Sequence, residues 1–302
     1  MELVYIKSFE AYLQLEKGLS SATIVAYLRD LQKLVQYFEI HDIEQPMAAI
    51  TLEQLQGFLT YLNELGLSVN SQARIVSGIK AFFEYLILEE VVEYDPSVLL
   101  SAPKLTRSLP AVLSPQEIAN MINAIDHSKA EGLRNRAIIE VLYACGLRVS
   151  ELTDLKLSNL YLKVGFVKVI GKGNKERMIP IGETAIKHLE FYLHERAQMT
   201  NIKPKSEDIV FLNRRGGQLS RQMIFYVVKD LATLAGIDQV ISPHTFRHSF
   251  ATHLIEGGAN LKIIQDLLGH RSITTTELYT HLDMTYLRET IQLFHPRNQK
   301  PS

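Results

Sequence analysis

Residues 95–117 read DPSVLLSAPKLTRSLPAVLSPQE, and this stretch divides the chain into two unlike parts. It holds four prolines and shows no clear periodicity, which is typical of a linker. We place the linker itself at residues 103–113. The chain before it, residues 1–102, and the chain after it, residues 114–302, are therefore expected to fold as separate domains.

The domain before the linker is expected to be a four-helix bundle. Apolar residues recur at helical spacing in residues 3–18 and again after residue 21. Thr51, followed three residues later by Gln54, forms a capping box that predicts the start of a third helix. A fourth helix is predicted over residues 70–90, and four such helices can enclose a compact core.

The domain after the linker is expected to be mainly helical with one small antiparallel sheet. Ser114 and Glu117 form a capping box with proline at the first helical position, so a helix begins here. Residues 165–181 alternate like a β-hairpin, with turn-forming residues at 171–174. Further helices are predicted at about 115–127, 132–145, 183–199, 220–235, 244–257, 261–269 and 285–294.

The composition is that of a globular protein, with 46% apolar and 22% charged residues. The single cysteine, Cys145, excludes a disulfide framework within the chain and fits a reducing compartment. No apolar run reaches the roughly 18 residues that a membrane helix needs. Charges spread through the first helix argue against a signal peptide. We therefore expect a cytoplasmic protein that does not associate with membranes.

The net charge of −1 hides an asymmetry between the two domains. Residues 1–105 carry 7 Lys and Arg against 14 Asp and Glu, whereas residues 106–302 carry 25 against 19. An acidic front and a basic back indicate domains with different tasks.

The stretch PHTFRHSFATHL, residues 243–254, holds three histidines and one arginine. A pair of histidines four residues apart can share one helix face, as in a metal site. A zinc site of the H-E-x-x-H kind would add a glutamate, whereas Arg247 stands here and cannot ligate a metal. We therefore expect no metal, and we interpret His248 and His253 as structural.

A phosphate site is the better interpretation of the same stretch. His244 and Arg247 project from one side near a helix start, where the helix dipole favours anions. Arginine also presents a rigid fork that suits two phosphate oxygens. Arg148, in YACGLRVSEL, is a candidate second arginine, and Glu151 is placed to orient it. A purely structural ion pair between Arg148 and Glu151 explains that spacing equally well.

Two further segments supply groups that could attack phosphorus or move protons. In LLGHRSITTTELYTHL, His270 follows a helix-ending glycine and Tyr279 comes nine residues later. Lys172 lies between two glycines in IGKGNKER. Each residue alone is more often structural or solvated. Together with the arginines they form the set that a metal-free phosphoryl transfer requires.

These motifs, with the ending FHPR, resemble those of the tyrosine recombinases, specifically of the bacterial Xer type. The resemblance covers essentially the whole chain and shows no departure at a catalytic position. It implies a helical, SAM-like core-binding domain at residues 1–102. It also implies a mixed α/β catalytic domain, mostly helical with a small antiparallel sheet, at residues 114–302. The implied activity is site-specific recombination of duplex DNA without any cofactor.

The resemblance implies a role for each catalytic candidate. The tyrosine would attack phosphorus and form a covalent 3′-phosphotyrosyl link, while the two arginines clamp the non-bridging oxygens. The two histidines would hydrogen-bond the phosphate, and the lysine would protonate the leaving 5′-oxygen. These candidates are Arg148, Lys172, His244, Arg247, His270 and Tyr279.

Other DNA contacts are expected in both domains. The basic second domain would supply most of the attraction, and the acidic first domain must gather its few cations on one face. The helix that begins after residue 220 opens with side chains suited to phosphates and base edges. The candidates are Arg74, Lys80, Lys175, Arg221 and Gln222.

The resemblance implies partners as well. They are duplex DNA with a dif-like site, a sister recombinase of the XerC type in a tetrameric synapse, and an FtsK-like translocase. The implied task is to resolve chromosome dimers during segregation. The resemblance also implies that the apolar segment 285–294 passes into a neighbouring subunit, so that deletion from Thr285 leaves a folded monomer. Periodicity alone favours a helix packed on its own domain.

Other functions stay open on the residues. A type IB topoisomerase or a phage or mobile-element integrase would share the chemistry, and the short N-terminus disfavours both. A non-cleaving DNA-binding regulator on the same fold would be expected to have lost Tyr279 or an arginine, and all are present.

Overall fold

The chain forms two compact units, residues 1–108 and 109–302. The structure is a computed structural model that describes residues 3–102, 111–129, 131–171, 175–269 and 281–298. Most of the linker expected at 103–113 lies outside the described residues. Its last residue, Leu113, is 1% exposed and belongs to the core of the second unit.

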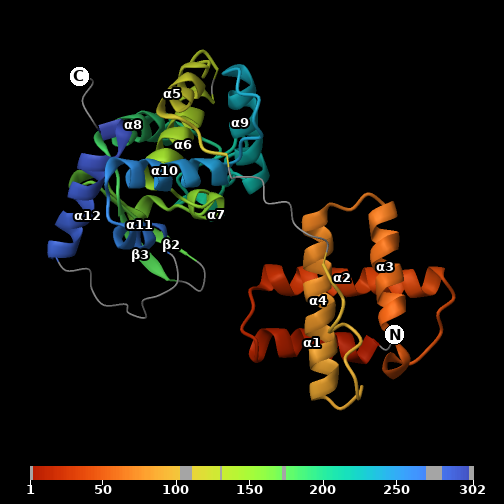
Figure 1. Ribbon diagram of the computed structural model, residues 1–302. Helices are drawn as coiled ribbons and strands as arrows, with labels where there is room; N and C mark the ends of the chain where they lie inside the picture. The colour runs from red at the N-terminus through yellow and green to blue at the C-terminus, as the bar shows by residue number, and fades with distance from the viewer. Residues whose placement is uncertain (1–2, 103–110, 130, 172–174, 270–280, 299–302) are drawn as a thin grey trace. The chain divides into compact units, whose positions relative to one another are not determined.

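The first unit is the expected helical bundle. In Figure 1, α1 and α2 run side by side and α4 crosses both of them. Thr51 and Gln54 form the predicted capping box at the start of α3. Aromatic side chains fill the centre, because Phe9, Phe58 and Phe82 are completely buried. The elements are α1 (Leu3–Leu15), α2 (Ser21–Ile40), η1 (Met47–Ala49), α3 (Leu52–Glu64) and α4 (Val69–Leu88).

The second unit is built around α6 (Gly132–Cys145), which packs against α8 and α10 (Figure 1). Residues 137–145 of this helix are all buried, which explains its lack of a polar face. The capping box of Ser114 and Glu117 starts α5, as predicted. The other helices are α5 (Pro115–Asn123), α7 (Val149–Thr153), η2 (Leu157–Asn159), η3 (Leu162–Val164), α8 (Glu183–Ala197), η4 (Pro204–Ser206), α9 (Arg221–Leu234), α10 (Pro243–Gly257), α11 (Leu261–Leu268), α12 (His281–Phe294) and η5 (Pro296–Asn298).

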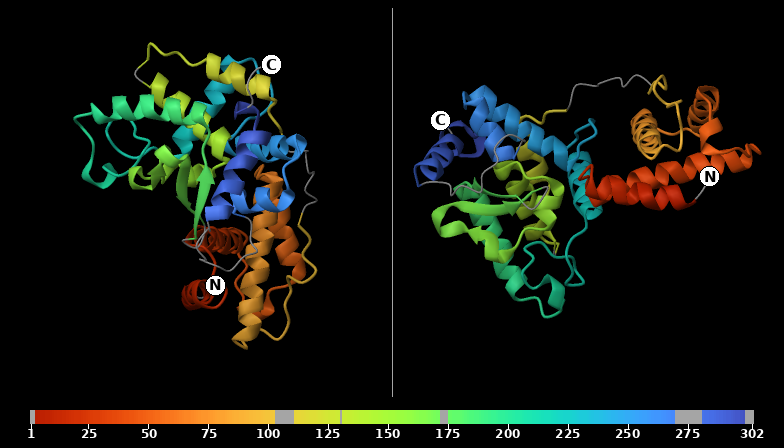
Figure 2. Two further views of the ribbon diagram at one scale, coloured as in Figure 1. Left: turned by 90° about the vertical axis from the view of Figure 1, so that its left-hand side faces the viewer. Right: turned by 90° about the horizontal axis from the view of Figure 1, so that it is seen from below.

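A small antiparallel sheet completes this unit in the order β1 (Leu160–Tyr161), β2 (Phe166–Ile170) and β3 (Glu176–Pro180). The predicted hairpin is β2 and β3, with Val167 opposite Ile179. β1 was not predicted, because two residues are too few to show an alternation. Both α11 and α12 pack against β3, and the left view of Figure 2 shows these helices, in blue, beside the green strands.

The C-terminal segment packs on its own unit in this single chain, whereas the resemblance implies that it passes into a neighbouring subunit. Ile291 is 1% exposed and lies in the core. His295 is completely buried and lies 3.2 Å, through Nε2, from the carbonyl oxygen of Tyr143. Arg297 donates to Glu140 at 3.1 and 2.5 Å. In this single chain, packing agrees with the helical periodicity, and truncation at residue 285 would open the core.

Candidate active site

The position of Arg148 follows from a sharp turn at the end of α6. Gly146 ends the helix with a φ of 57°, and a Cβ there would lie 2.5 Å from the Phe250 ring, so glycine is needed. Arg148 is then the N-cap of α7. Its backbone N–H donates to Glu151 Oε2 and its Nη1 donates to Oε1, each at 2.8 Å. The predicted Arg148–Glu151 ion pair is therefore present.

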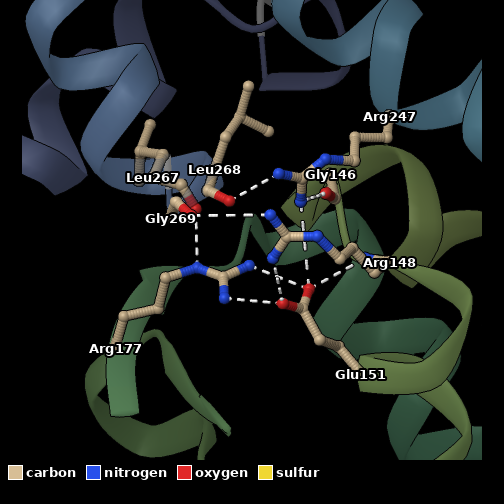
Figure 3. A network of polar contacts seen from close by, with 8 residues as sticks. All are labelled: Gly146, Arg148, Glu151, Arg177, Arg247, Leu267, Leu268 and Gly269. Carbon is tan, nitrogen blue, oxygen red and sulfur yellow. Dashed lines mark hydrogen bonds and ion pairs between the residues drawn. The ribbon is translucent and has the colours of Figure 1, made fainter. Parts of the chain in front are cut away.

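Arg247 reaches the same carboxylate from α10. Its guanidinium is buried and donates to the carbonyl oxygens of Gly146, at 2.9 Å, and Leu268, at 2.5 Å. Its Nη1 lies 3.9 Å from Glu151 Oε2. The structure thus brings together the two arginines that the sequence singled out, with the Arg148 guanidinium between Arg247 and the Glu151 carboxylate (Figure 3).

A third arginine, Arg177 on β3, was not among the predicted site residues. Its Nη1 and Nη2 donate to the two oxygens of Glu151 at 2.7 and 2.9 Å, and its Nε donates to the Leu267 carbonyl at 2.8 Å. The sequence did hold a signal. Arg177 alternates with Ile179 and Ile181, so it is a charged residue on the buried face of its strand.

The cluster of Arg148, Arg177, Arg247 and Glu151 has an excess of positive charge. Burial raises the pKa of the Glu151 carboxyl, but the hydrogen bonds and charges of Arg177 and Arg148 outweigh it and hold the pKa below its usual range. Burial, and then the charge of Arg148, lowers the pKa of Arg247 to about 10. Arg247 is still protonated at neutral pH. Three guanidinium groups against one carboxylate leave two positive charges that an anion can neutralise.

The histidines of α10 have separate environments. His244 is exposed in the first turn, one turn before Arg247, and His248 is half-buried. His253 is buried, and its Nδ1 lies 2.8 Å from the Tyr143 hydroxyl, in accord with a structural role.

Three of the catalytic candidates, Lys172, His270 and Tyr279, lie outside the described residues. Lys172 and His270 are close in the sequence to residues that contact the arginine cluster. Lys172 follows β2 by two residues, and His270 directly follows Gly269, whose carbonyl oxygen lies 3.5 Å from Arg148 Nη2.

Two DNA-contact candidates lie on α4. Arg74 contacts the buried carboxylate of Asp30 and donates to the Ala26 carbonyl at 3.3 Å, and its side chain is 39% exposed. Lys80 is half-buried and donates to the Val98 carbonyl at 3.1 Å. Both cations are thus partly engaged within their own unit.

The candidates in the second unit are exposed. Lys175 directly precedes β3. Arg221 and Gln222 open α9 after the N-cap Ser220, as predicted, and Gln222 donates to the Tyr226 hydroxyl at 3.1 Å.

Among the described residues, none of the helices has the length and apolarity to cross a membrane. Within the same residues, no three histidine, cysteine or acidic side chains are grouped so that they could hold a metal ion.

Two family models match the chain. Residues 111–285 match the phage integrase family, and residues 6–90 match the phage integrase N-terminal SAM-like domain. The second match covers the helical bundle, and the first covers the arginine cluster together with the three candidates outside the described residues.

Curated relatives match over nearly the full length, and among them are tyrosine recombinases XerD, which agrees with the resemblance of the motifs. The chain is 42% identical to tyrosine recombinase XerD of Oceanobacillus iheyensis, over 97% of this chain and 98% of the relative. It is 43% identical to that of Staphylococcus saprophyticus over the same shares. Among solved structures, the XerH site-specific recombinase bound to a palindromic difH substrate, a post-cleavage complex, is 25% identical with a TM-score of 0.71, covering 95% of this chain and 84% of that one.

Proposed function

The chain belongs to the phage integrase family and is a site-specific tyrosine recombinase, and we propose that it cuts and rejoins duplex DNA through a 3′-phosphotyrosyl intermediate at Tyr279. The observation that carries this proposal is the buried cluster in which Arg148 and Arg247 meet around Glu151 with unbalanced positive charge. Such a cluster is suited to a phosphodiester, whose negative charge redistributes during the reaction.

The arginines act on the transition state. Arg148 and Arg247 hold the two non-bridging oxygens, and their hydrogen bonds strengthen as phosphorus becomes five-coordinate. Because the guanidinium of Arg247 is fixed by two carbonyl oxygens, little reorganisation is needed at that moment.

The remaining groups move the atoms. The Tyr279 oxygen forms a bond to phosphorus while the bond from phosphorus to the 5′-oxygen breaks, and Lys172 gives that oxygen a proton. Free tyrosine has a pKa of about 10, so the nearby positive charge favours the attacking phenolate. His244 and His270 hydrogen-bond the phosphate, and one of them helps to deprotonate the tyrosine. The new ester keeps the energy of the broken one, so rejoining needs no nucleotide.

The substrate we propose is a dif-like chromosomal site, recombined to resolve chromosome dimers before cell division. Two observations support it: the XerD relatives match almost end to end, and the XerH structure holds a difH substrate. A sister recombinase of the XerC type and an FtsK-like translocase would complete the synapse, and the enzyme would work in the cytoplasm.

The further DNA contacts are also proposals. Exposure supports Lys175, Arg221 and Gln222, and within the described residues the one internal hydrogen bond of these side chains is that between Gln222 and Tyr226. Arg74 and Lys80 would have to exchange an internal partner for a phosphate.

A nicked suicide substrate tests the proposed function, because loss of the short fragment past the nick traps the covalent intermediate. The wild type should form a protein–DNA adduct that survives denaturant. Tyr279→Phe should bind the site normally and form none, whereas the control Tyr286→Phe, at an exposed position on α12, should form it at the wild-type rate. An adduct with Tyr279→Phe would remove Tyr279 as nucleophile. Specific binding by the wild type without any adduct would favour a non-cleaving regulator.

A further inference from the structure

We propose that Arg177 is a positioning residue of this site, which fixes the Glu151 carboxylate and the end of α11 relative to each other and so holds the two catalytic arginines in register. The inference rests on the proposed function, since it assigns a part in the same cleavage reaction. It concerns a residue that does not itself need to touch DNA, because its side chain is only 7% exposed.

Arg177 joins three separate segments of the chain. Its own strand, β3, belongs to the hairpin whose sequence holds Lys172. Two of its nitrogens bind Glu151 on α7, and the third binds the Leu267 carbonyl at the end of α11 (Figure 3). It also lines Gly269 closely, since a Cβ on that glycine would lie 3.3 Å from Arg177 Nη1.

Arg148 and Arg177 share the two oxygens of the Glu151 carboxylate. Oε1 accepts from Nη1 of Arg148 and Nη1 of Arg177, and Oε2 accepts from the Arg148 backbone and Nη2 of Arg177. Arg177 therefore supplies half of these four hydrogen bonds. Without it, each oxygen would keep a single donor, and the carboxylate could rotate and carry the Arg148 guanidinium with it.

Only arginine can make this set of contacts. The planar guanidinium spans both carboxylate oxygens and still directs Nε toward a carbonyl on a different element. A lysine at the position would keep the charge but would reach Glu151 through one nitrogen. The geometry thus requires the fork as well as the charge.

Arg177 also keeps Glu151 ionised. Burial favours the neutral acid, and the opposing influences from Arg177 are larger than those from Arg148. Arg247 faces the same carboxylate from α10 at 3.9 Å. On the other side, a cavity next to Glu151 is lined by further charged side chains, namely Asp154, Lys156 and Lys168. Protonation would place a hydrogen on one Glu151 oxygen and remove the negative charge, which would weaken the contacts with Arg148.

The experiment uses the full-length protein and measures single-turnover adduct formation on saturating suicide substrate, from about pH 5.5 to 8.5. The variants are Arg177→Met, Arg177→Lys, Glu151→Gln and the double variant Arg177→Met/Glu151→Gln. The matched control is Arg196→Met. Arg196 is equally buried, and within the described part of the chain its partners are the carbonyl oxygens of residues 206, 207 and 209. A ¹³C-carboxyl titration of Glu151, assigned by its absence in Glu151→Gln, gives a readout that does not need cleavage.

For Arg177→Met, the carboxyl pKa should rise, and the cleavage rate relative to the wild type should fall about tenfold for each pH unit below that pKa. In Arg177→Lys, the Glu151 pKa and the cleavage rate should lie between those of the wild type and those of Arg177→Met. The double variant should have the same pH profile as Glu151→Gln, because there is no carboxyl left to protonate. Arg196→Met should lower the melting temperature and leave the profile unchanged.

The inference would be overturned if the cleavage rate of Arg177→Met depended on pH as the wild-type rate does, and if that rate were reduced no more than the rate of Arg196→Met. If Arg177→Lys cleaves at the wild-type rate at every pH, the two-oxygen contact of the guanidinium is not needed, and the inference is wrong. This variant gives the test if Arg177→Met does not fold. If the wild type forms no adduct, the proposed function fails. The carboxyl titration then stands alone: an unmoved Glu151 pKa in the Arg177 variants contradicts the inference, and a raised one supports it.

Discussion

Two buried carboxylates, Glu151 in the second unit and Asp30 in the first, differ in how fully they are bonded. Glu151 accepts two hydrogen bonds on each oxygen. Asp30 is equally buried and contacts Arg74 through Oδ2, but its Oδ1 finds no hydrogen-bond partner among the described residues and lies 3.5 Å from Lys33. Both sites hold a buried carboxylate, yet only at Glu151 do both oxygens accept hydrogen bonds.

Their pKa values move in opposite directions as a result. Burial raises the pKa of Asp30, and the charges of Arg74 and Lys33 do not offset it. For Glu151 the hydrogen bonds and charges of Arg177 and Arg148 overcome the same effect, and the pKa is lowered. Burial alone therefore does not decide the ionisation of a carboxyl group. The number of donors fixed around it does.

The largest effect is expected for Glu151→Gln. The amide leaves Arg177 buried without a counter-ion, which should destabilise the second unit by about 3–5 kcal/mol. The substitution should also slow adduct formation at saturating DNA, because Arg148 loses the carboxylate that orients its guanidinium. Chemical denaturation and the suicide substrate measure the two quantities on the same protein.

The control for that prediction is Glu140→Gln. Glu140 is equally buried and paired with Arg297, but it lies outside the arginine cluster. It should lose stability and keep the cleavage rate of its folded fraction. Equal losses of rate in both variants would reduce Glu151 to a structural ion pair, the alternative that the sequence left open.

A smaller effect is expected for Asp30→Asn. Arg74 is partly exposed and can turn to water, so the first unit should change by less than about 1 kcal/mol at neutral pH. Because the folded pKa of Asp30 lies above its usual value of 3.8, the folded state binds more protons between the two values. The wild-type unit should thus lose stability as pH rises through that window.

Asp30→Asn should remove this pH dependence, and the difference between the two proteins isolates it from other groups. Hydrogen exchange of the core amides of Leu31 and Ile79 reports the stability of the first unit in the intact chain. A loss of several kcal/mol, as large as that in Glu151→Gln, would break the contrast between the two carboxylates.

The sequence was informative where local rules decide the structure. Capping boxes at Thr51 and Ser114 predicted two helix starts, and alternation around residues 171–174 predicted the hairpin. The spacing of Arg148 and Glu151 predicted their contact.

Other features depend on contacts between segments that lie far apart in the chain. The place of Arg177 beside Glu151 depends on how β3 packs against α7 and α11, and no local pattern gives that distance. The contact of Arg247 with the carbonyl of Gly146 spans 101 residues for the same reason. For the last helix, the packing within this single chain agrees with the helical periodicity, because the apolar face fits the core of its own unit.

The most direct test of the account compares DNA affinity with the rate of adduct formation for Arg148→Ala and Arg247→Ala, with Arg221→Ala as the matched control on an exposed helix start. The account predicts that each cluster variant forms adduct about 10²–10³-fold more slowly at saturating DNA. Its affinity should change only a few-fold, because many other phosphate contacts share the binding. Arg221→Ala should lower the DNA affinity and leave the rate of adduct formation at saturating DNA nearly unchanged. Equal losses of affinity and rate in both cluster variants would contradict the account, because the arginines around Glu151 would then bind DNA without stabilising the transition state.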